Sequence, residues 1–191
     1  MSSTSEQEIS ATEQETLLDL ASTTIQRGLT GKTSRPRYDK HGGLLVERGA
    51  CFVTLNCDDR LRGCIGTLEA FRPLAHDVTD NAYSAAFRDP RFSPLTIGEY
   101  SRIEIHISVL TPASPVIFQS EQDLIEQLNP QIDGLILSLG RQRGTFLPSV
   151  WESLPDPRDF LLHLKRKAGL PADFWSDEIK VERYHTISVF R

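Results

Sequence analysis

The stretch CFVTLNCDDRLRGCIG, residues 51–66, decides the fold. Apolar and polar residues alternate from Cys51 to Asn56, which is typical of a strand with one buried face. Asp58 and Asp59 then form a turn, and residues 61–66 run back beside the first strand. The stretch therefore predicts a β-hairpin.

Helices and further strands are predicted on both sides of this hairpin. They are, in chain order, a helix from a capping box at Ser10 and Glu13 to Gly28, a helix from Arg72-Pro73 to Asp89-Pro90, a strand from Ile103 to Val109, a helix over 121–128, strands over 135–139 and 145–147, a helix from Asp156 to Gly169, and a last strand over 179–189. Residues 1–12 are expected to be disordered, and residues 30–43, with His41, to form a surface loop. Because short hairpin-like links join most of these elements, the fold class is α+β with antiparallel sheets.

Composition excludes several classes of protein. The chain has 191 residues, 39% hydrophobic and 25% charged, which is typical of a globular protein. A net charge of −5 disfavours nucleic acid as a partner. The polar N-terminus and the lack of a long apolar run predict a cytoplasmic protein without a membrane span. Cys51, Cys57 and Cys64 form no C-x-x-C pair, so we expect no disulfide framework, no metal site and no cofactor.

The returning strand of the hairpin carries the strongest candidate site. Arg62 and Cys64 share one face of the strand, roughly 6 to 7 Å apart. Gly63 and Gly66 flank the thiol and indicate that a ligand or another chain segment approaches this backbone closely. A guanidinium beside a thiol would lower the pKa of the thiol and hold an anionic or carbonyl group. The alternative is a packed cysteine next to a bulge, and both readings stay open here.

Other polar residues give weaker signals. Arg88 and Arg91 flank Asp89-Pro90, where two guanidinium groups can grip a carboxylate or a phosphate, although an Asp89 turn paired with its neighbours explains the pattern equally. His76 lies one turn before Asp80 on the same predicted helix, an arrangement that fits either a general base or a solvated face.

Seven short segments resemble one known family. They are FVTL (52–55), LRGCIG (61–66), DPRF (89–92), ISVLTP (107–112), DGLI (133–136), LPSV (147–150) and KAGLP (167–171). Together they resemble the AMMECR-one domain family, whose prokaryotic members are called AmmeMemoRadiSam system protein A. The resemblance implies two α+β subdomains, each built on an antiparallel sheet. With the proline-rich boundary at Thr111 to Pro115, it predicts a larger subdomain over 13–111 plus 176–191, a smaller inserted one over 112–175, and a cleft between them that LRGCIG lines.

The resemblance implies a pathway and supplies no reaction. We expect a protein that binds a substrate or a partner polypeptide in this cleft, in a pathway with Memo-type and radical-SAM proteins. The alternative is a cysteine-dependent enzyme in which Cys64 is catalytic and Arg62 stabilises an anion or carbonyl, so whether the protein is an enzyme stays open. The expected ligand-binding residues are Arg62, Gly63, Cys64, Gly66, Arg88 and Arg91.

Overall fold

A computed structural model describes residues 9–32 and 42–190 of the chain. The predicted disorder of residues 1–8 and the position of His41 therefore lie outside the described residues. Residues 9–12, also expected to be disordered, are ordered instead. Ile9 is buried, Ser10 and Glu13 form the expected capping box, and the first helix begins at Ala11. The chain divides into unit 1, Met1–Leu110 with Ile187–Arg191, and unit 2, Thr111–Thr186.

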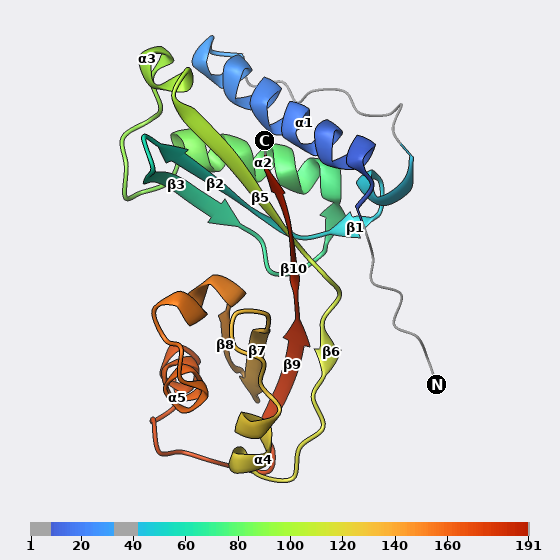
Figure 1. Cartoon of the computed structure of the whole chain (residues 1–191), viewed down its shortest axis with the longest axis vertical. Helices are drawn as coiled ribbons and strands as arrows, with labels where there is room; N and C mark the ends of the chain where they lie inside the picture. Colours follow the sequence, from blue (N-terminus) through green and yellow to red (C-terminus); the bar gives the residue numbers. More distant parts are fainter. Residues whose placement is uncertain (1–8, 33–41, 191) are drawn as a thin grey trace. The chain divides into compact units, whose positions relative to one another are not determined.

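Unit 1 is built on a four-stranded sheet in the order β10-β5-β2-β3 (Figure 1). The strands are β2 (Cys51–Cys57), β3 (Arg60–Gly66), β5 (Ile103–Leu110) and β10 (Thr186–Phe190). β2 pairs antiparallel with both β3 and β5, so the predicted hairpin places β2 inside the sheet and β3 at its edge. Asp58 and Asp59 make its two-residue turn with left-handed backbones, at φ 50° and 61°.

Two long helices cover one face of this sheet. They are α1 (Ala11–Leu29) and α2 (Leu74–Phe87). Every second residue of β2 packs into their shared core, namely Cys51, Val53 and Leu55, together with Ile107 and Val109 of β5. The other residues of these strands face away from the helices, since side chains alternate along a strand. The smaller elements are η1 (Gly43–Leu45), β1 (Arg48–Gly49), which pairs with β4 (Arg72–Pro73), and α3 (Ile97–Tyr100).

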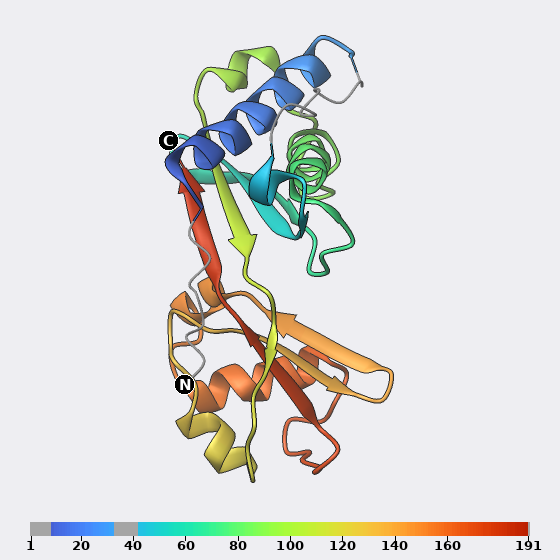
Figure 2. The same cartoon turned by 90° about the vertical axis from the view of Figure 1, so that its right-hand side faces the viewer.

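Unit 2 has its own sheet and its own core (Figures 1 and 2). The strand order is β6-β9-β7-β8, with β6 (Ser114–Pro115), β9 (Lys180–Tyr184), β7 (Gly134–Leu139) and β8 (Gln142–Phe146), and all of its pairs are antiparallel. The helices are α4 (Glu121–Glu126), η2 (Pro148–Glu152) and α5 (Pro157–Lys167). In the core Trp151 stacks on Phe160, with 3.7 Å between ring centroids. The protein is thus α+β with antiparallel sheets, as the sequence predicts.

The C-terminal segment differs from the expectation. Residues 179–189 were predicted to be one strand, but they form β9 and β10 in different sheets. Residues 176–186 belong to unit 2 and not to the larger subdomain, because β9 pairs with β7 and β6 of unit 2. The apolar pattern runs on through both strands, so it gives no sign of the break.

Candidate functional site

The face of the unit 1 sheet that points away from α1 and α2, here called the open face, carries a row of side chains from all four strands. Thr54 of β2 is directly opposite Cys64 of β3 on one side and His106 of β5 on the other. The ring of His106 stacks on Phe190 of β10, with 5.6 Å between centroids. All four of these side chains are at least partly exposed to solvent.

Thr54 and Cys64 are in direct contact within this row. Thr54 Oγ1 donates a hydrogen bond to Cys64 Sγ across 3.2 Å. The backbone of Cys64 explains the closeness, because its N–H and C=O both point away from β2. The N–H donates to Asp89 Oδ2 (2.9 Å) and the carbonyl accepts from Arg91 Nη2 (3.2 Å). Opposite residues without mutual backbone bonds have the closest side chains in an antiparallel pair.

Asp89 and Arg91 together cover the edge of β3 at Cys64. Arg91 Nη2 and Nε donate to the Asp89 carboxylate over 2.7 and 3.0 Å. This pairing with Arg91 is the main reason that the pKa of Asp89 lies far below its usual range, and the Cys64 and Arg91 amides lower it further. The Asp89 side chain is 1% exposed and that of Arg91 is 53% exposed, so the carboxylate is fixed in place while the guanidinium faces solvent. The edge strand is therefore not open to pairing with another strand at this point.

Arg62 points to another partner. Its Nε donates to Glu99 Oε1 (2.7 Å), and its Nη2 donates to Glu99 Oε2 (3.2 Å) and to the Ser93 carbonyl (2.9 Å). Hydrogen bonding from Arg62 is the main reason that the pKa of Glu99 is lowered to about 2. With 12% of its side chain exposed, Arg62 fastens the 93–99 segment to β3. The structure thus brings Arg91, and not the guanidinium of Arg62, to the backbone of Cys64.

Parts of the chain itself occupy the space beside both glycines of LRGCIG. A Cβ at Gly63 would lie 2.1 Å from the Ala85 carbonyl oxygen of α2, and one at Gly66 would lie 2.2 Å from the Phe52 ring. Between the two possibilities that the sequence left open, another chain segment makes the close approach. Whether these glycines also contact a ligand stays a prediction.

Arg88, the sixth predicted site residue, lies at the end of α2. Its guanidinium is over the Tyr83 ring, 5.0 Å from the centroid. The described contacts do not bring it to Cys64 or Asp89. It therefore serves as a natural control for Arg91, because both are exposed arginines in the same turn.

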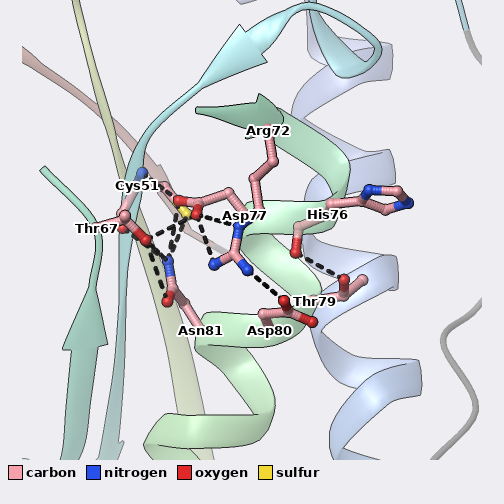
Figure 3. Close-up of polar contacts among 8 residues, drawn as sticks. All are labelled: Cys51, Thr67, Arg72, His76, Asp77, Thr79, Asp80 and Asn81. Carbon is pink, nitrogen blue, oxygen red and sulfur yellow. Dashed lines mark hydrogen bonds and ion pairs between the residues drawn. The ribbon is translucent and has the colours of Figure 1, made fainter. Parts of the chain in front are cut away.

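A buried polar network holds the segment that follows LRGCIG (Figure 3). The fully buried carboxylate of Asp77 accepts hydrogen bonds from the Cys51 amide (2.8 Å), Thr67 Oγ1 (2.7 Å), Arg72 Nε (2.8 Å) and Asn81 Nδ2 (3.0 Å). Arg72 also pairs with Asp80. These bonds join β2, α2 and the 67–72 connection, so they fix the end of β3.

The same network sets the surroundings of Cys51 and of Asp80. Burial, followed by the charge of Asp77, raises the pKa of the Cys51 thiol well above its ordinary value, so Cys51 is a packed residue. Asp80 pairs with Arg72, and the ring of His76 points away from Asp80 in Figure 3. Within this network the cation paired with Asp80 is Arg72, and a general-base role of His76 stays a prediction.

Unit 2 contains an acid–imidazole pair that sequence reasoning missed. The buried carboxylate of Asp133 lies 3.1 Å from His185 Nε2 and 3.1 Å from Arg183 Nε. His185 also exchanges two hydrogen bonds of 2.9 Å with Thr111, from its amide to Oγ1 and from the Thr111 amide to its carbonyl. These hydrogen bonds join the segment in which the chain enters unit 2 to the segment in which it leaves. Asp133 is part of the DGLI segment, and that was its only signal in the sequence.

Comparison with known proteins identifies the family. A family model described as AMMECR1 matches residues 18–189. The chain belongs to the AMMECR1 family. Relatives in this family include protein MJ0810 of Methanocaldococcus jannaschii, 36% identical over 84% of this chain and 81% of the relative, and a Thermotoga maritima protein, 37% identical over 81% and 84%.

A solved structure supports the fold. The crystal structure of the uncharacterized protein PH0010 from Pyrococcus horikoshii is similar with a TM-score of 0.78 and 34% identity, covering 91% of this chain and 89% of that one. Within residues 9–32 and 42–190, no helix has the length and apolar content to cross a membrane. The described residues also contain no cluster of three or more His, Cys, Asp or Glu side chains that could hold a metal ion.

Proposed function

We propose that this AMMECR1-family protein binds, on the open face of unit 1, a ligand that presents a carbonyl or carboxylate group to Cys64 and Arg91. The observation that carries the proposal is the Asp89–Arg91 pair at the backbone of Cys64. It holds both backbone polar groups of Cys64 and leaves a guanidinium half exposed beside a partly exposed thiol. Guanidinium groups bind carboxylates in a planar fork, and Nη1 of Arg91 is not used by Asp89 or Cys64.

The ligand is a substrate or a segment of a partner polypeptide. A polypeptide presents carbonyl groups along its length, and the open face offers it hydroxyl, imidazole and aromatic side chains at Thr54, His106 and Phe190. The family resemblance supports a role beside Memo-type and radical-SAM proteins in a cytoplasmic pathway. The predicted cleft is part of this proposal.

Cysteine chemistry is the second candidate, and the hydrogen bond from Thr54 to Cys64 Sγ favours it. A hydroxyl donor stabilises a thiolate, which is the reactive form of cysteine. In this version Cys64 is the nucleophile, and Arg91 takes the anion-stabilising role that the sequence predicts for Arg62. His106, on the other side of Thr54, is the nearest imidazole along the row.

The test compares two alkylating reagents of similar size, neutral iodoacetamide and anionic iodoacetate. We would measure their rates at Cys64 and at Cys57 by peptide mass spectrometry in the same sample. Cys57 is the internal control, because the Asp58 carboxylate, 3.8 Å from its Sγ, is paired with Arg102, so neither reagent is favoured there by an unpaired charge. The iodoacetate-to-iodoacetamide ratio should be higher at Cys64 than at Cys57. Arg91→Gln should lower the Cys64 ratio about fivefold, as expected for the loss of about 1 kcal/mol of charge attraction at a half-exposed site.

Two variants separate charge from structure. Arg91→Lys keeps the positive charge and should keep most of the preference for iodoacetate, whereas Arg88→Gln should leave the ratio unchanged. Equal ratios at Cys64 and Cys57 in the unmodified protein would contradict an anion-binding site at Cys64. Cys64→Ser then distinguishes the two candidates in a reconstituted pathway with Memo-type and radical-SAM proteins. Lost turnover with an intact complex indicates chemistry at the thiol, and unchanged turnover indicates binding alone.

A further inference from the structure

Unit 2 contains a pocket of its own, and none of the residues that line it belongs to the Cys64 site. Its volume is about 510 Å³, which is within the range of small-molecule sites. α4, α5 and residues 172–175 form its wall, all of them in unit 2. The side chains that matter for its chemistry are Lys165, Glu121, Arg158, Ile125, Leu162 and Trp175.

Lys165 is the unusual member of this wall. Only 2% of its side chain is exposed, and lysine is almost never buried to this extent unless it is paired. Its Nζ donates to Glu121 Oε1 (2.6 Å) and to the Phe174 carbonyl (3.1 Å). An ammonium group has three N–H donors, so one remains after these two bonds. Because Lys165 lines the pocket, a ligand there can accept this third N–H.

The rest of the wall divides into an apolar part and a charged rim. Ile125, Leu162 and Trp175 supply apolar surface. Arg158 is exposed and donates to Gln122 Oε1 (2.6 Å). The acidic residues of the rim are Asp173, which is exposed, and Glu121, whose side chain is 35% exposed. The positive charge of Lys165 is therefore deep in the wall, while the side chains of both signs at the rim are solvated. Glu121 neutralises the Lys165 ammonium, so the pocket selects a ligand through the remaining N–H of Lys165, a charged donor held where water is excluded, and not through a net positive charge.

We propose that this pocket binds a small amphipathic carboxylate. The carboxylate accepts the third N–H of Lys165, and the apolar part of the ligand packs against Ile125, Leu162 and Trp175. Here the pocket wall places the buried cation, the apolar surface and the open volume together.

The probes are 4-phenylbutyrate and its neutral counterpart 4-phenylbutyramide, titrated into the full-length protein. Proton–nitrogen NMR spectra resolve the two indole N–H groups. Trp175 lines the pocket, and Trp151 is in the core, where its Nε1 donates to the Asp133 carbonyl (2.8 Å). We expect the acid to shift the Trp175 signal and to bind about tenfold more tightly than the amide, as a charged hydrogen bond implies. The Trp151 signal should stay in place and report an intact core.

Lys165→Met replaces the ammonium with an apolar chain of similar length. It should remove the preference for the acid while the amide still binds, and Lys167→Met, an exposed lysine on the same helix, should change neither affinity. If Lys165→Met loses the core Trp151 signal, the comparison of acid with amide on the unmodified protein decides. No shift of Trp175 with either probe, or equal affinities for the two, would overturn the proposal. Neither result depends on the Cys64 site.

Discussion

Thr54 donates a hydrogen bond to Cys64 across the β2–β3 hairpin, with 3.2 Å between Oγ1 and Sγ. Cys51, at the start of β2, shows the contrasting case. Its thiol is fully buried, and burial together with the charge of Asp77 raises its pKa. The chain thus places one cysteine in the core and another on the open face, where a hydroxyl group fixes its position.

Removing this donor should slow the alkylation of Cys64. Thr54→Val keeps the shape of the side chain and deletes the hydroxyl, which at about 1 kcal/mol predicts a roughly fivefold lower rate with iodoacetamide at neutral pH. Cys57 in the same sample should react as before. An unchanged rate at Cys64 would show that the Thr54 hydroxyl has no influence on the reactive thiolate.

Gly63 should tolerate no side chain. Gly63→Ala places a Cβ 2.1 Å from the Ala85 carbonyl oxygen, a backbone atom of α2, and we expect unit 1 to lose about 1 to 3 kcal/mol of stability. The matched control is Gly98→Ala, because a Cβ at Gly98 meets nothing within 4 Å.

The two units need separate measures of unfolding in this experiment. Both tryptophans are in unit 2, so the buried thiol of Cys51 is the better reporter for unit 1, through its exposure to a thiol reagent in rising urea. Equal urea midpoints for the Gly63 and Gly98 variants would argue against the close contact with α2.

Glu99 should make unit 1 sensitive to acid. Its pKa is lowered to about 2 by Arg62, so its ion pair stabilises the folded state above the ordinary value of 4.5, and this stability is lost as the pH falls from 4.5 through about 2. Glu99→Gln should flatten the decline of urea stability over this window, while Glu104→Gln, an exposed residue on β5, should leave it intact. A wild-type slope in Glu99→Gln would mean that another carboxylate governs the acid response.

The Asp77 network should be essential to the stability of unit 1. Arg72→Met removes the cation from a fully buried carboxylate, and breaking a buried pair from one side typically costs about 3 to 5 kcal/mol. Arg60→Met, at an exposed position of β3, is the control and should be nearly neutral. Thiol exposure at Cys51 is again the measurement, and a loss below about 1 kcal/mol would show that Asp77 does not depend on Arg72.

The sequence predicts the parts of this protein that depend on local pattern. Alternation along residues 51–66 and two turn-forming aspartates are sufficient for the hairpin, and the face shared by Arg62 and Cys64 follows from the strand period of two. The strand periodicity cannot predict which partner the charged group of a long side chain will bind. The guanidinium of Arg62 binds Glu99, whose position depends on how the 93–99 segment packs.

Contacts between distant residues explain the remaining differences. Asp89 and Arg91 pair within one turn, as one of the two sequence readings had it, but their bonds to the Cys64 backbone depend on α2 packing against β3. Asp133 directly precedes β7 and His185 directly follows β9, so the two residues meet only once these strands pair. Neither contact leaves a periodic signature in the sequence.

The position of β10 after unit 2 in the chain has a consequence for synthesis on the ribosome. β2, β3 and β5 emerge first, but the neighbour of β5 is made only after all of unit 2. At about 5 to 20 residues per second, unit 2 has several seconds in which to fold while one edge of the first sheet is still unpaired. An unpaired edge is a template for aggregation. A nascent chain that stalls before Ile187 therefore exposes the edge of β5. We expect chaperones that recognise unpaired strands to bind the chain at this stage of synthesis.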